Sequence, residues 1–170
     1  MMKMFKLLKL ADAFTLANLT CGFMSILYSF SESFAGAALF LLAAMVFDYL
    51  DGFVARKRKE GNIFGKELDS LCDLVSFGVA PAVFGYALGL DSLFAIIVLI
   101  AFVCAGALRL CRFNVTKIEG FEGVPITVNA LLFPTLYFGS LFFPLPLFVY
   151  LLGYITMTFL MVSTLKIKKL

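Results

Sequence analysis

The stretch FAGAALFLLAAMVFDYLDGFVARKRKEGNIFGKELDSLCD, residues 34–73, decides how the chain folds. It begins with a long apolar run that ends at Asp48 and Asp51. After a short basic loop, Asp69 and Asp73 precede the next apolar run. A carboxylate beside an apolar segment is costly unless it has a partner. Four carboxylates at the facing ends of two such segments therefore indicate a binding or catalytic site.

Long apolar runs continue on both sides of this stretch. The chain has 170 residues, is 62% hydrophobic and has a mean hydropathy of +1.03, unlike an ordinary soluble domain. Six runs of about 17–20 residues could each cross a hydrocarbon core of roughly 30 Å as a helix. They are Phe14–Phe30, Phe34–Leu50, Leu74–Leu90, Ser92–Leu108, Val124–Phe143 and Leu147–Leu165. The sequence predicts an all-α polytopic membrane protein with six transmembrane helices, forming a single domain over residues 1–170.

The basic residues predict the orientation of these spans. With six spans, all 14 Lys and Arg fall on one side, and the short loops on the other side carry none. The positive-inside rule makes the basic side cytoplasmic. We therefore expect a multi-pass protein of the cytoplasmic membrane with both termini in the cytoplasm. Apolar residues interleaved with Lys3, Lys6 and Lys9 predict an N-terminal amphipathic helix at the membrane interface, although a frayed charged tail is the simpler alternative.

The composition excludes several kinds of catalytic site. The chain has no histidine, which rules out Ser-His-Asp and Cys-His nucleophilic machinery and imidazole zinc sites. Its four cysteines form no C-x-x-C pair, which argues against thiolate metal sites and disulfides. Catalysis would have to rest on carboxylates, basic groups or a metal ion. We expect a lipid bilayer and no nucleic acid as the partner.

The spacing of the four aspartates predicts a metal site. Asp48 and Asp51 are three residues apart, and Asp69 and Asp73 are four apart, so each pair lies on one helical face. Antiparallel neighbouring helices would let the two faces meet, and bound cations would offset the repulsion between the carboxylates. Oxygen ligands without nitrogen or sulfur suit Mg²⁺, Mn²⁺ or Ca²⁺, and four carboxylates can hold two such ions.

The residues between the aspartate pairs predict a bound phosphate ester. Gly52 and Ala55 leave the helix face open to a bulky ligand, and Arg56 offers a planar fork that suits a phosphate. Gly65 would serve the turn back into the membrane. The simpler explanation, solvated loop charges at a membrane border, fits residues 57–60 better than it fits the aspartates.

The pattern D-x2-D-G-x2-A-R-x8-G-x3-D-x3-D, which runs from Asp48 to Asp73, resembles the signature of the CDP-alcohol phosphatidyltransferase family at every fixed position. The six spans and the N-terminal amphipathic helix are also similar to that family. The resemblance implies that Asp48, Asp51, Asp69 and Asp73 bind two Mg²⁺ or Mn²⁺ ions, and that Asp73 is the general base.

The resemblance also implies a site for the CDP-linked lipid. Its residues would be Asp12, Thr15, Asp51, Gly52, Ala55, Arg56, Asn62 and Gly65. At position 62 the family often has a small hydroxyl residue, and here it is asparagine. The resemblance further suggests a homodimer.

Three stretches outside the signature bear on the acceptor alcohol. NLTCGFMSI (residues 18–26), GALRLCRFNV (106–115) and GFEGVPITVNA (120–130) resemble the phosphatidylserine synthase branch, with departures at Cys111, Val124 and Thr127. This resemblance implies transfer of the phosphatidyl group from CDP-diacylglycerol, or CDP-archaeol, to L-serine. Arg109 and Arg112 could hold the serine carboxylate.

Two other functions stay open from the residues alone. Glycerol 3-phosphate or an inositol-type acceptor would also use arginines, so Arg109 and Arg112 do not choose among the acceptors. A divalent-cation transporter would also use aspartates. It would, however, need acidic groups near the middle of the membrane, and here they gather at one side.

Overall fold

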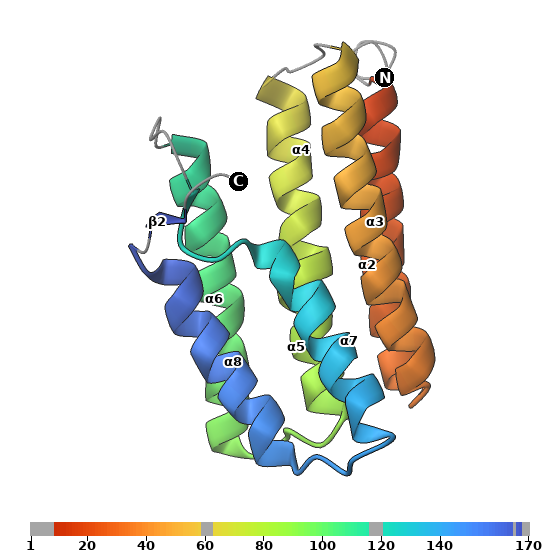
Figure 1. Cartoon of the computed structure of the whole chain (residues 1–170), viewed down its shortest axis with the longest axis vertical. Coiled ribbons are helices and arrows are strands. Elements are labelled where there is room, and N and C mark those ends of the chain that lie inside the picture. Colours follow the sequence, from red (N-terminus) through yellow and green to blue (C-terminus); the bar gives the residue numbers. More distant parts are fainter. Residues whose placement is uncertain (1–8, 59–62, 116–120, 165, 168–170) are drawn as a thin grey trace.

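The computed structural model describes residues 9–58, 63–115, 121–164 and 166–167 (Figure 1). The predicted N-terminal amphipathic helix and Asn62 therefore lie outside the described residues. The described chain is almost entirely helical, which confirms the predicted all-α class. Its helical elements are α2 (Leu10–Phe30), α3 (Phe34–Arg58), α4 (Ile63–Asp73), η1 (Leu74–Val79), α5 (Ala80–Ala87), α6 (Leu93–Val115), η2 (Ile126–Val128), α7 (Asn129–Ser140) and α8 (Leu147–Val162).

Four of the predicted spans form helices long and apolar enough to cross a membrane. These are Leu10–Phe30, Phe34–Arg58, Ile63–Ala87 and Leu93–Val115, whereas Ile126–Ser140 and Leu147–Val162 are shorter apolar helices. Helix α3 runs on to Arg58, and the next helix begins at Ile63, well before the predicted Leu74. Hydropathy falls at the first charged residue, but the helical hydrogen bonds of the backbone continue beyond it. The helices therefore extend past the apolar runs and carry all four aspartates.

The helices alternate in direction, which gathers the functional loops at one end. The start of α2, the end of α3, the start of α4 and the end of α6 lie at the same end of the bundle (Figure 1). Short connections at the other end join α2 to α3, α5 to α6 and α7 to α8. Helix α2 packs along α3, and α6 packs along α8. A two-residue antiparallel ladder pairs β1 (Phe121–Glu122) with β2 (Lys166–Ile167) at the aspartate end of this second pair.

The third long helix changes to a π-helix directly after Asp73. This segment, η1, is followed by Pro81, which has no N–H to donate to the carbonyl of Phe77 one turn earlier. The side chain of Asn129 supplies the missing donor, with its Nδ2 at 3.0 Å from the Phe77 carbonyl oxygen. A π-helical turn inside an α-helix is common at functional sites. Here it separates the aspartate-bearing half of the helix from the apolar half.

The apolar half is held by a buried aromatic cluster. Tyr154 stacks on Phe133 with ring centroids 3.9 Å apart and meets Phe102 edge to face at 5.1 Å. The Tyr154 hydroxyl donates to the carbonyl oxygen of Pro81 at 2.6 Å. A Cβ at Gly85 would lie 2.6 Å from that hydroxyl oxygen, so glycine is needed for this contact. The cluster therefore fixes the position of the third helix against α7 and α8.

Tyr154→Phe tests this hydrogen bond. The substitution leaves the buried Pro81 carbonyl without its donor, so we expect it to lower the free energy of unfolding by about 1–3 kcal/mol. The lowered midpoint of thermal unfolding in detergent measures the effect. Tyr86→Phe is the matched control, because Tyr86 on α5 is 48% exposed. Equal midpoints for the two variants would show that the hydroxyl does not hold the helix.

Candidate active site

Carboxylates from α3 and α4 meet at the end of the bundle where α3 ends and α4 begins. One oxygen from each of Asp48, Asp51 and Asp69 lies within 4.8 Å of the others. The carboxyl group of Asp73 lies within hydrogen-bonding reach of Asp48. Asp51 and Asp73 are buried, at 7% exposure each. The spacings of three and four residues thus bring all four predicted ligands into one site, three in a compact group and Asp73 beside it.

The donor set fits a hard divalent cation. The group offers only oxygen ligands, the kind that Mg²⁺ and Mn²⁺ prefer. Asp51 Oδ2 and Asp69 Oδ1 are buried, and neither has a hydrogen-bond partner within the described ranges. Buried carboxylate oxygens without a donor are costly, and a bound cation would remove that cost. The residues present therefore match the metal site that the sequence predicts.

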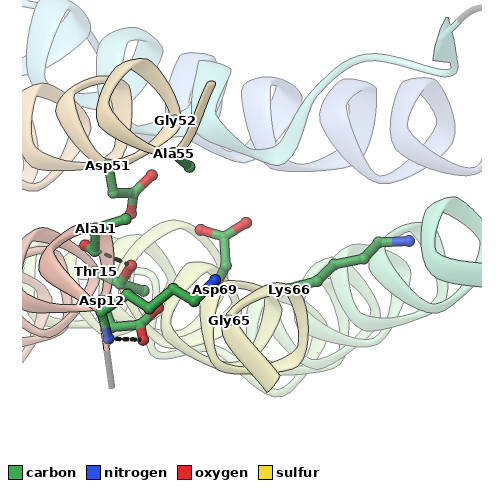
Figure 2. A pocket seen from close by; sticks show the side chains of 10 residues that line it. Ala11, Asp12, Thr15, Asp51, Gly52, Ala55, Gly65, Lys66 and Asp69 are labelled. Atoms are coloured by element: carbon green, nitrogen blue, oxygen red, sulfur yellow. Dashed lines mark hydrogen bonds between the residues drawn. The ribbon is translucent and has the colours of Figure 1, made fainter. Parts of the chain in front are cut away.

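A cavity of about 220 Å³ opens on the α2 side of the aspartates (Figure 2). Its lining residues come from α2, α3 and α4 and the residue before α2: Lys9, Ala11, Asp12, Thr15, Asp51, Gly52, Ala55, Gly65, Lys66 and Asp69. The Asp12 carboxylate accepts a hydrogen bond from the backbone N–H of Lys9 at 2.8 Å, which caps α2. Six of the eight residues predicted to bind the CDP-linked lipid line this cavity. Arg56 does not, and Asn62 lies outside the described residues.

A second cavity of about 300 Å³ opens on the α6 side. It shares Asp51, Gly52, Lys66 and Asp69 with the first and adds residues from α3, α4 and α6 and from the segment before α7. The added residues are Asp48, Tyr49, Arg56, Ser70, Asp73, Arg109, Leu110, Phe113, Asn114, Pro125 and Thr127. Asp51 and Asp69 thus line both cavities, whereas Asp48 and Asp73 line only the second. Two ligands could meet at the carboxylates from opposite sides.

Arg109 and Arg112, which the sequence predicts to bind the acceptor together, have different surroundings in the structure. Arg109 lines the second cavity, is 8% exposed, and its buried Nε has no hydrogen-bond partner in the described part of the chain. Arg112 instead donates to the backbone carbonyls at the C-terminal end of α8, which are those of Met161 (3.3 Å), Val162 (3.0 Å) and Ser163 (3.0 Å). Unpaired carbonyls at a helix C-terminus attract a cation, and this attraction turns Arg112 away from the cavity.

Sequence reasoning assigned no role to three polar residues near the aspartates. Asn114 Nδ2 donates to the Ser70 hydroxyl at 2.9 Å, which ties α6 to α4. Asn18, fully buried on α2, donates its Nδ2 to Asp73 Oδ1 at 3.1 Å. Asn18 is an amide side chain inside a predicted membrane span, where a polar group is costly, and that cost was the available signal. Nothing in the sequence spacing links it to Asp73, which is 55 residues away.

Comparisons with known proteins agree with this arrangement. Residues 8–166 match the sequence profile of the CDP-alcohol phosphatidyltransferase family. The CDP-diacylglycerol--serine O-phosphatidyltransferase of Saccharomyces cerevisiae is 42% identical over 141 residues, covering 72% of this chain and 51% of the relative. The enzyme of the same name from Methanocaldococcus jannaschii is 42% identical over 127 residues, covering 75% and 59%.

A third relative has a different name. The archaetidylserine synthase of Methanothermobacter thermautotrophicus is 41% identical over 140 residues, covering 79% of this chain and 60% of the relative. The chain therefore spans about half to three fifths of the length of these three curated relatives.

Proposed function

Because the chain belongs to the CDP-alcohol phosphatidyltransferase family, we propose that it transfers the phosphatidyl group of CDP-diacylglycerol to L-serine. The products are phosphatidylserine and CMP, or the archaeal ether-lipid analogue where CDP-archaeol is the donor. The observation that carries the proposal is the placement of the aspartates between two cavities. The curated relatives named for serine transfer support the choice of acceptor.

The four aspartates would hold two divalent ions, Mg²⁺ or Mn²⁺. When bound, such ions neutralise charge on the pyrophosphate and make CMP a better leaving group. Asp48, Asp51 and Asp69 supply the compact group of oxygens, and Asp73 adds a fourth carboxylate beside them. The chain's own contribution is to hold these carboxylates on α3 and α4, which both pack against α2, so that little rearrangement is needed when the ions bind.

The first cavity would receive the CDP group. Gly52 and Ala55 on α3 and Gly65 on α4 keep its walls free of large side chains, while Asp12 and Thr15 present polar groups from α2. Its position at the end of the bundle would let the nucleotide enter from water while the lipid tails stay in the bilayer. Arg56, which lines the second cavity, would meet a phosphate where the two cavities join.

The second cavity would receive serine. Asp73 would take the proton from the serine hydroxyl as its oxygen attacks the phosphorus that carries the diacylglycerol. The new O–P bond forms as the bond to the CMP oxygen breaks. The guanidinium of Arg109, which is buried and whose Nε has no hydrogen-bond partner among the described residues, would bind the serine carboxylate. This arrangement orients the hydroxyl toward the phosphate held on the other side of the aspartates.

The chain is a multi-pass helical membrane protein, and we propose a specific orientation for it. Six helices would span the bilayer, the two shorter ones with local thinning, since sixteen residues reach only about 24 Å. The basic residues of the described helices lie close to the helix ends at the aspartate end of the bundle. The active site and both termini would therefore face the cytoplasm. The family resemblance supports a homodimer.

CMP release by the purified full-length chain tests the proposal. The protein is incubated with CDP-diacylglycerol and Mg²⁺ or Mn²⁺, and serine, glycerol 3-phosphate or inositol is added in turn. We expect release with serine only. Release with glycerol 3-phosphate alone would overturn the acceptor assignment, and no release with any alcohol would contradict the enzyme assignment. Asp73→Asn is the matched control, which should lose turnover but still bind CDP-diacylglycerol.

The two arginines give a second prediction. Arg109→Lys keeps the charge but removes the planar fork, so we expect kcat/KM for serine to fall about 10- to 100-fold, equivalent to roughly 1.5–3 kcal/mol. Arg112→Lys should instead lower the midpoint of thermal unfolding, because it weakens the contact with the end of α8, and leave the serine KM within about twofold of wild type. The reverse pattern would place the acceptor at Arg112.

A further inference from the structure

Asn18 connects α2 to the proposed catalytic base. Its side chain is fully buried, and its Nδ2 donates to Asp73 Oδ1 at 3.1 Å. Asn18 does not line either of the two cavities beside the aspartates. It therefore contacts the carboxylate from behind, on the side away from the substrates.

The backbone around Asn18 is docked firmly against the segment that follows Asp73. The Ser76 hydroxyl on η1 donates to the backbone carbonyl of Asn18 at 3.1 Å. One turn further along α2, a Cβ at Gly22 would lie 2.7 Å from Ser76 Cα, so only glycine permits this approach. The π-helical segment and α2 thus hold Asn18 and Asp73 in a fixed relation.

Packing alone does not account for an asparagine at this position. Asn18 Oδ1 is buried and has no hydrogen-bond partner within the described ranges. A buried amide oxygen without a donor costs free energy, so an apolar side chain of similar size would fill the space at lower cost. The benefit that offsets the cost is the N–H that Asn18 gives to the carboxylate.

This N–H has a direct consequence for Asp73. Three other carboxylates lie nearby and would repel it, which favours rotation of the Asp73 carboxylate away from them. A donor on Oδ1 fixes one oxygen and leaves the other for the second cavity, where the acceptor hydroxyl would lie. We propose that Asn18 is a positioning residue that sets the orientation of the Asp73 carboxylate for proton transfer. The inference rests on the proposed function, because it assumes that Asp73 is the base.

The test compares Asn18→Ala and Asn18→Leu in the full-length chain. Both remove the donor, and leucine also refills the space. At saturating serine and Mg²⁺ we expect both variants to lose kcat by about 10- to 100-fold, the usual effect of removing a residue that orients a functional ligand. The KM for serine and the affinity for CDP-diacylglycerol should stay within about threefold, since Asn18 lines neither cavity.

Asn129→Leu is the matched control. Asn129 is also fully buried and also donates its Nδ2 to the third helix, at 3.0 Å, but to the Phe77 backbone carbonyl instead of a carboxylate. Loss of the hydrogen bond from Asn129 should lower the midpoint of thermal unfolding and leave kcat near the wild-type value.

The outcomes separate this inference from the proposed function. Wild-type kcat in Asn18→Leu would overturn the inference, because it would show that Asn18 only fills space. Equal losses of kcat in Asn18→Leu and Asn129→Leu would also overturn it, since the effect would be general to buried amides. Absence of serine-dependent CMP release by the wild-type chain would contradict the proposed function itself.

Discussion

The repulsion among four carboxylates in a largely apolar helix bundle is the constraint on which the rest of the structure depends. Asp48, Asp51, Asp69 and Asp73 project from α3 and α4, and two buried oxygens of this group, one each on Asp51 and Asp69, have no hydrogen-bond partner in the described part of the chain. Such an arrangement is unfavourable without cations. The close packing of α2 against α3, the π-helical turn after Asp73 and the small residues around the cavities all serve to hold it in place.

The position of this group between two cavities accounts for the proposed chemistry. Residues of the sequence signature line both cavities; α2 completes the first, and α6 with the segment before α7 completes the second. A donor and an acceptor that enter from different sides meet only at the carboxylates. The signature therefore describes the part of the site common to the family. In the proposed function, the choice of alcohol would depend on residues such as Arg109 that come from helices the signature does not include.

The sequence predicted the features that depend on short-range spacing and missed those that depend on packing between distant helices. Spacings of three and four residues were enough to place the aspartates on matched faces, and apolar runs were enough to find the helices. The predicted ends of the second and third spans were wrong, because hydropathy changes at the first charged residue whereas the backbone hydrogen bonds of the helix continue beyond it. The contact of Asn18 with Asp73 and the orientation of Arg112 toward α8 depend on how distant helices pack together. Residue spacing within one helix does not predict this packing.

The number of Mn²⁺ ions bound per chain in the presence of CDP tests the central claim most directly. Electron paramagnetic resonance of the purified protein counts bound Mn²⁺ without requiring turnover. We predict two bound ions for the wild-type chain. Asp69→Asn should bind fewer Mn²⁺ ions and with lower affinity, because the change removes one carboxylate oxygen of the compact group. Equal Mn²⁺ binding by the two proteins, or none by the wild type, would contradict a metal site built from these aspartates.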